Sequence, residues 1–266
     1  VIVATSDQNH RDPCLQAMSR RKHVMVEKPL ATTVEDAQAI ADAAASSGLT
    51  VMVGHTLRFD ARYTLAHDTI KAGRIGRIGH IYARRSGPVT PIGRRLGGRT
   101  SVAFFLGSHD VDVMHWFTGS RVRSVYALAR RELLRDLEVD DTIIALLEFD
   151  NGVIATLEMS WALPDCPGPR TAPLFEVVGT TGMIQVMAYQ QGLTIYTGQG
   201  AETPNLFYES WIHGRKVGVY NAEIRHFLDC ITTNTRPVVG AEEGLRAVEV
   251  VRAIHRSLEL GSKVEL

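Results

Sequence analysis

The sequence predicts an α/β protein, in which the last part of a parallel β-α-β sheet is followed by an α+β domain with a mainly antiparallel sheet of about six strands. Residues 1–54 alternate short β-branched runs with helical segments, the pattern that gives a parallel sheet through right-handed crossovers. Residues 121–197 hold several apolar runs separated by turn signals, which is typical of antiparallel strands. We therefore expect two domains, residues 1–57 and residues 58–266.

The first domain is predicted from three apolar runs and two helical patterns. The elements expected in order are a strand at 1–4, a helix at 11–19, a strand at 23–27, a helix at 33–48 and a strand at 50–54. Thr33 is the expected N-cap of the second helix, with Asp36 three residues later, and Gly48 closes it.

The second domain is predicted to begin with a helix at residues 61–72, which leads into a Gly-, Pro- and Arg-rich stretch reaching about residue 99. An apolar helix then covers residues 104–118 and closes at Gly119. The expected strands are 122–129, 142–149, 153–161, 175–178, 183–187 and 193–196, and the expected closing helices are 221–232 and 241–260. Asp150-Asn151-Gly152 predicts a hairpin turn between the second and third of these strands.

Composition favours a small-molecule partner over nucleic acid or a membrane. Lys plus Arg and Asp plus Glu both total 29, so no net charge attracts a polyanion or an anionic surface. No apolar run approaches the roughly 18–20 residues that span a bilayer. The three cysteines, Cys14, Cys166 and Cys230, have no metal-binding or redox spacing, and we expect buried thiols in a cytoplasmic protein with no metal site.

Lys28 is the first candidate for a residue that carries chemistry. It follows the buried run at residues 23–27 and precedes Pro29, which disfavours helical geometry at Lys28 and fixes the direction in which the chain leaves the sheet. Ligands of open α/β sheets bind at the carboxyl ends of the strands, where this lysine would lie. The alternative is an exposed lysine at a strand end.

His109 is the second candidate. On a helix, His109, Asp112 and Trp116 share one face, so Asp112 is expected to orient the imidazole and favour its protonated form. The alternative is a histidine satisfied within the core.

Several motifs together resemble the Gfo/Idh/MocA family of NAD(P)-dependent sugar and polyol oxidoreductases. They are Val3-Ala4-Thr5 with His10, the segment His23–Ala31, Val53-Gly54-His55 with Arg58-Phe59, and the segment His109–Trp116. The resemblance runs the whole length of the chain. It implies the C-terminal part of a Rossmann domain joined to a substrate-binding and oligomerisation domain, with NAD or NADP as cofactor.

The resemblance also implies roles for particular residues. Lys28 matches the lysine that hydrogen-bonds the reacting hydroxyl, and His109 matches the acid/base histidine, so both would be catalytic and both would contact substrate. The implied cofactor-binding residues are Thr5, Ser6, His10, Glu27, Lys28, Pro29 and Tyr220, and Arg58 is implied to line the substrate cleft with Tyr220. Phe105 stands where inositol-type members commonly carry an aspartate, a departure that argues against an inositol substrate.

The start of the chain predicts that part of the nucleotide fold precedes it. No G-x-G-x-x-G stands upstream of Lys28, and the sequence begins at Val1 without methionine. Two or three β-α units normally come before this point, so we expect about 60–70 further residues. A chain without the glycine loop would bind the cofactor pyrophosphate weakly.

A strong charge asymmetry precedes the helix of His109. There is no acidic residue between Asp68 and Asp110, whereas the interval holds Lys71, Arg74, Arg77, Arg84, Arg85, Arg94, Arg95 and Arg99. A solvated loop is one interpretation. The other is an anionic substrate group, such as the phosphate of a sugar phosphate, held by Arg94 and Arg95.

The function predicted from these observations is hydride transfer between a nicotinamide and a carbinol or carbonyl carbon of a sugar, sugar derivative or polyol, in either direction. A non-catalytic ligand sensor or partner-binding protein of the same fold stays open, as does a chain that is inactive alone. The free face of the antiparallel sheet predicts a homodimer or homotetramer.

Overall fold

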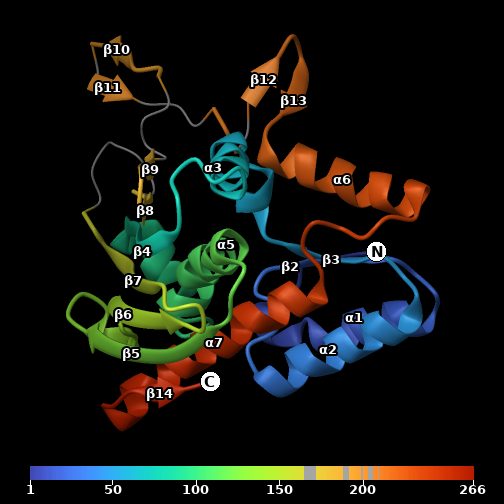
Figure 1. The fold of residues 1–266 in the computed structure, drawn as a ribbon, viewed down its shortest axis with the longest axis horizontal. Helices are drawn as coiled ribbons and strands as arrows, with labels where there is room; N and C mark the ends of the chain where they lie inside the picture. The colour runs from blue at the N-terminus through green and yellow to red at the C-terminus, as the bar shows by residue number, and fades with distance from the viewer. Residues whose placement is uncertain (165–171, 188–191, 199, 203–205, 209) are drawn as a thin grey trace.

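The computed structural model describes residues 1–164, 172–187, 192–198, 200–202, 206–208 and 210–266. A small parallel sheet and a large mixed sheet lie on opposite sides of a long C-terminal helix (Figure 1). This arrangement confirms the predicted fold class.

The small sheet contains β1 (Ile2–Val3), β2 (Val24–Glu27) and β3 (Val51–Gly54), which run parallel in the order β1-β2-β3. Helices α1 (Arg11–Ser19) and α2 (Val34–Ser47) connect them and pack against each other. The predicted β-α-β-α-β order is therefore confirmed.

The ends of α2 follow the predicted capping chemistry. The Thr33 hydroxyl accepts a hydrogen bond from the Asp36 backbone N–H at 3.2 Å, which satisfies one of the free amides of the first turn. Gly48 closes the helix at φ +65°, a left-handed conformation that glycine adopts without steric cost.

The large sheet has seven strands in the order β14-β5-β6-β7-β4-β8-β9. They are β4 (Ile78–Pro88), β5 (Val122–Arg130), β6 (Thr142–Phe149), β7 (Ile154–Leu163), β8 (Leu174–Gly179), β9 (Met183–Met187) and β14 (Val264–Glu265). The pairing is antiparallel except between β4 and β7, which run parallel. The predicted hairpin turn joins β6 to β7, with Gly152 at φ +84°.

Strand β4 corrects the prediction of an irregular stretch up to residue 99. It lies between β7 and β8 in the large sheet. Glycines at both ends and the Arg84-Arg85 pair hide the strand pattern in the sequence. Arg85 nevertheless points inward and is only 4% exposed, because the carboxylate of Asp110 binds its guanidinium.

The last predicted strand of the sheet is also placed differently. Residues 195–197 form β10 (Ile195–Thr197), which pairs with β11 (Gly200–Glu202) in a separate hairpin. A second hairpin, β12 (Ser210–Ile212) with β13 (Arg215–Val217), precedes α6. Both hairpins project from the body of the fold (Figure 1).

The remaining helices are α3 (Ala61–Lys71), the short α4 (Arg94–Leu96), α5 (Ser108–Thr118), α6 (Val219–Thr233) and α7 (Ala241–Leu260). A π-helical turn, Ala103–Gly107, leads into α5, and Gly119 closes it at φ +59°. Helix α7 packs on α2, α5 and β5, so it connects the two sheets (Figure 1). A Cβ on its Gly244 would lie 2.9 Å from Val53 Cγ2, so this close approach requires glycine.

Within the described residues, no helix combines the length and apolar character needed to cross a bilayer, and no three His, Cys, Asp or Glu side chains converge as a metal site. Cys14 and Cys230 are buried free thiols, and burial raises the pKa of Cys14 to about 12. Cys166 lies outside the described residues.

We predict that Gly179→Ala weakens the large sheet. A Cβ at this end of β8 would lie 2.1 Å from the backbone oxygen of Ile75, which cannot move away as a flexible side chain could. Such overpacking costs about 1–3 kcal/mol, which urea unfolding would measure.

Gly79→Ala is the matched control, because its Cβ would meet Val178 O at an ordinary 3.6 Å. Equal unfolding midpoints for the two variants would contradict the prediction.

Candidate functional site

A group of charged and imidazole side chains gathers where β2 and β3 end. Glu27 and Gly54 are paired in register, so the next residues, Lys28 and His55, leave neighbouring strands together. Helix α5 brings His109 to the same place. This is the carboxyl edge of the parallel sheet, where open α/β sheets bind ligands.

Lys28 contacts the π-helical turn that precedes α5. Its Nζ donates a hydrogen bond to Phe105 O at 2.8 Å and lies 4.5 Å from the centroid of the Phe105 ring. Burial lowers the pKa of Lys28 to about 8, although Asp7 and Glu27 act in the opposite direction. The Lys28 side chain can therefore exchange its proton, as ammonium or amine, close to neutral pH.

His109 is half-buried, and its Nδ1 is buried without a hydrogen-bond partner. Burial lowers the pKa of His109 well below its usual value, and the positive charges of Lys28 and Arg85 lower it further. The ring is therefore neutral at pH 7 and able to accept a proton.

The expected contact between Asp112 and His109 is replaced by a buried ion pair. Arg58 Nε donates to Asp112 Oδ2 at 2.8 Å and Arg58 Nη2 to Oδ1 at 2.7 Å. Burial alone would raise the pKa of Asp112, but the charge of Arg58 and its hydrogen bonds hold that pKa below its usual range. The sequence prediction that Asp112 favours protonated His109 was therefore wrong.

Arg58, predicted to line the substrate cleft, is only 8% exposed. Besides Asp112, it binds Val238 O at 2.7 Å and lies 5.3 Å from the Trp116 ring. Its guanidinium is thus committed to holding α5 against the end of the parallel sheet.

A second buried ion pair lies on the other side of the same helix. Arg85 on β4 binds Asp110 through Nε at 2.8 Å and Nη2 at 2.7 Å. Arg85 was recognised in the sequence only as part of the basic run. The strand period that turns it inward was the missing signal.

His10, predicted to bind cofactor, connects two loops of the site. Its Nδ1 lies 2.8 Å from Pro29 O and its Nε2 lies 3.2 Å from Thr5 O, and the ring is 1% exposed. It thereby ties the loop after β1 to the loop after β2. Thr5 and Ser6 on the first of these loops remain exposed.

The predicted substrate-binding arginines, Arg94 and Arg95, and the predicted cofactor-binding Tyr220 make their described contacts with residues other than Lys28. Arg94 Nη1 binds Asp136 Oδ2 at 2.8 Å on the surface, and Arg95 is exposed. These positions give no support to their predicted role in holding a substrate anion. Tyr220 is 42% exposed in the first turn of α6, with its ring centroid 5.9 Å from that of Tyr208.

Glu223 is a residue that sequence reasoning missed. It is 1% exposed and its Oε1 has no hydrogen-bond partner among the described atoms. Burial, with a further contribution from Glu27, raises the pKa of Glu223 to about 8. Its spacing between the buried Val219 and Phe227 on α6 was the available signal, because a carboxyl on a helix's apolar stripe is unusual.

Two family models match the chain. Residues 1–55 match an oxidoreductase family with an NAD-binding Rossmann fold, and residues 63–185 match the GFO/IDH/MocA C-terminal domain. Both models describe parts of the same family.

Curated relatives and solved structures agree with this match. Scyllo-inositol 2-dehydrogenase (NAD(+)) of Bacillus subtilis (strain 168) is 27% identical, covering 100% of this chain and 77% of the relative. 1,5-Anhydro-D-fructose reductase of Ensifer adhaerens is also 27% identical, covering 100% of this chain and 79% of the relative. In fold, scyllo-inositol dehydrogenase from Lactobacillus casei with NAD(H) and scyllo-inositol superposes with a TM-score of 0.84 at 21% identity, over 100% of this chain and 79% of that one.

We predict that Glu223→Gln makes the fold less sensitive to alkaline pH. Between the ordinary pKa of 4.5 and about 8, the wild-type carboxyl is protonated in the folded chain but ionised in the unfolded chain. The free energy of unfolding therefore falls by about 1.4 kcal/mol for each unit of rising pH in that window. The glutamine variant should be roughly 2–4 kcal/mol more stable than wild type at pH 8, with little advantage at pH 4.5, in urea unfolding at each pH.

Asp229→Asn, on the exposed side of the same helix, is the control and should not gain stability with rising pH. A constant difference between Glu223→Gln and wild type from pH 4.5 to pH 8 would show that Glu223 is not held protonated.

Proposed function

Because the chain belongs to the Gfo/Idh/MocA family of oxidoreductases, with a Rossmann fold that binds NAD, we propose that it transfers a hydride between a nicotinamide and a carbinol or carbonyl carbon of a sugar, sugar derivative or polyol. The observation that carries this proposal is the pair formed by Lys28 and His109 at the carboxyl edge of the parallel sheet, each with a depressed pKa. The inositol and anhydrofructose enzymes among the relatives favour a polyhydroxylated ring as substrate.

The residues at the site fit a nicotinamide cofactor. Asp7 Oδ2 is buried without a hydrogen-bond partner among the described atoms, and the negative charges of Asp7 and Glu27 both raise the pKa of Lys28. Two carboxylates near one lysine suit the cationic ring of an oxidised nicotinamide. Thr5, Ser6, Glu27 and Pro29 would hold the cofactor, with Tyr220 at the edge, and when bound the cofactor supplies or accepts the hydride.

Lys28 and His109 would divide the handling of the hydroxyl proton. Lys28, charged below about pH 8, donates a hydrogen bond to the reacting oxygen. Neutral His109 accepts the hydroxyl proton during oxidation and returns it during reduction. Phe105 contributes an apolar wall beside Lys28 Nζ, which keeps water from the ammonium.

Replacing either member of the pair should abolish most turnover. We expect Lys28→Met and His109→Ala to lower kcat by about 100-fold or more, the usual effect of removing an acid/base group. Nicotinamide absorbance follows the reaction with a panel of sugars and polyols.

Arg94→Gln is the matched control, since this arginine is paired with Asp136 on the surface. It should keep the kcat and KM of wild type, also for phosphorylated sugars. Near wild-type turnover in both Lys28→Met and His109→Ala would overturn the proposed catalytic pair.

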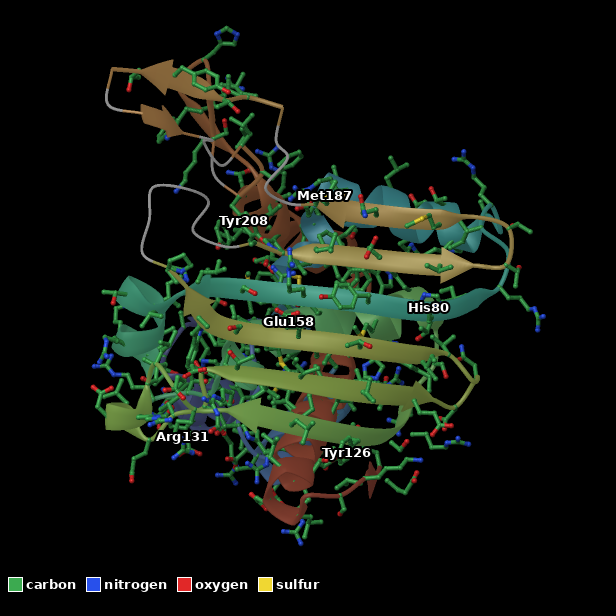
Figure 2. The ribbon with its side chains drawn as sticks, turned by 90° about the vertical axis from the view of Figure 1, so that its left-hand side faces the viewer. His80, Tyr126, Arg131, Glu158, Met187 and Tyr208 are labelled. Carbon is green, nitrogen blue, oxygen red and sulfur yellow. The ribbon has the colours of Figure 1, made fainter. Side chains whose placement is uncertain are left out.

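We further propose that two copies of the chain associate through the open face of the large sheet. Figure 2 shows this face with none of the described helices in front of it. Its exposed apolar side chains are Tyr126, Leu128, Ile144, Leu146 and Ile154. Three of them, Tyr126, Leu146 and Ile154, line a hollow of about 590 Å³. An apolar patch of this kind on a soluble surface marks an interaction site, and aligned packing of two such sheets buries it.

Leu146→Arg should weaken this association. The leucine is 56% exposed and lines the hollow, so a charge there would be desolvated on pairing. Sedimentation velocity should show the mass of a smaller species at concentrations where wild type is a dimer or tetramer. Leu228→Arg on α6, also 54% exposed, is the control and should sediment as wild type. Equal sedimentation of Leu146→Arg and wild type would contradict the proposed interface.

A further inference from the structure

The site contains a second imidazole, His55, that the proposed proton transfer does not use. His55 follows β3 directly and is 1% exposed, and neither of its ring nitrogens has a hydrogen-bond partner among the described atoms. Burial of an unpartnered polar group costs free energy. A second arrangement of the ring that forms hydrogen bonds would recover this cost.

The surroundings of His55 supply partners on two sides. Its Nδ1 lies 4.0 Å from Asp112 Oδ2, just beyond hydrogen-bond distance. His109 is one helical turn before Asp112 on the same face of α5, and its Nδ1 is also buried without a partner. His55 is also among the groups that influence the pKa of His109, so the two rings are neighbours. A rotation of the His55 imidazole toward Asp112 would let it bridge the carboxylate and the His109 ring.

We propose that His55 is the positioning residue of His109, and that it connects the Asp112 carboxylate to the His109 ring. In this arrangement His55 Nδ1–H donates to Asp112, and His55 Nε2 accepts the Nδ1–H of His109. His109 Nε2 is then left unprotonated and directed at the reacting hydroxyl. Asp112 thus orients His109, the proton acceptor, through His55. Arg58 holds the Asp112 carboxylate in place by two hydrogen bonds.

The charges around His55 are consistent with a neutral ring that can accept such a bond. Burial lowers its pKa, and Arg58 and Lys28 lower it further, whereas Asp112 and Glu243 raise it. The ring of His109 is neutral as well. Two neutral imidazoles can share one N–H without repulsion, because each has one donor and one acceptor nitrogen.

The arrangement also predicts which histidine tautomer is present. A histidine without a partner has no reason to protonate Nδ1 rather than Nε2, whereas the bond to His55 selects the Nδ1–H form of His109. This selection exists without substrate or cofactor. It can therefore be measured independently of turnover, on which the proposed function depends.

The test is the imidazole ¹⁵N spectrum of the ligand-free protein, with the His109 signals assigned from their loss in His109→Ala. Wild type should show His109 as the Nδ1–H tautomer, and His55→Phe should move it toward Nε2–H. His55→Gln, whose amide oxygen can accept the same bond, should restore the wild-type pattern. His115→Phe is the matched control, because both ring nitrogens of His115 are also buried without a hydrogen-bond partner among the described atoms, and it should leave the His109 signals unchanged.

Activity gives a second, separate reading that rests on the proposed function. His55→Phe should lower kcat by about 10- to 100-fold with little change in KM, and His55→Gln should recover much of it. Unchanged His109 signals in both His55 variants would overturn the positioning role whatever the turnover. Conversely, a shifted tautomer in a protein that turns over no sugar or polyol would support the role of His55 and contradict the proposed function. If His55→Phe does not fold, wild-type His109 in the Nε2–H form would be sufficient to reject the arrangement.

Discussion

Two buried guanidinium–carboxylate pairs determine where α5 lies, and the site depends on that placement. Arg58, which follows the parallel sheet, binds Asp112, and Arg85 of the large sheet binds Asp110. The helix is thereby fixed to both sheets within one turn, through residues two positions apart. Removal of one partner from a buried pair of this kind costs about 3–5 kcal/mol, because the other charge is left uncompensated. Because His109 lies next to Asp110 on this helix, both pairs determine its position.

The same pairs shape the electrostatics of the site. Asp110 and Asp112 are each occupied by an arginine, so neither carboxylate directly stabilises a proton on His109. Lys28 and the half-buried His109 therefore keep pKa values that burial has lowered. Phe105 places an aromatic ring against the lysine, with Lys28 Nζ 4.5 Å from the ring centroid. The combination favours a neutral His109 as proton acceptor beside a Lys28 ammonium of lowered pKa.

The local parts of this fold could be read from the sequence. The limits of α1, the N-cap of α2 and the hairpin turn between β6 and β7 depend on neighbouring residues, and each was predicted correctly. The central strand β4 was missed because its pattern is interrupted by glycines and a pair of arginines. Arg85 fits inside the protein only because Asp110, 25 residues away, is there to receive it.

The sequence by itself determined that Lys28 lies at the end of a strand and His109 at the edge of the apolar face of a helix, since both follow from periodicity and from the proline after the lysine. It could not determine which carboxylate serves which cation. Asp112 and His109 share a helix face, yet Asp112 binds Arg58, 54 residues away in the chain. Only the tertiary structure decided this, because a bidentate buried ion pair is stronger than a single contact with a neutral imidazole.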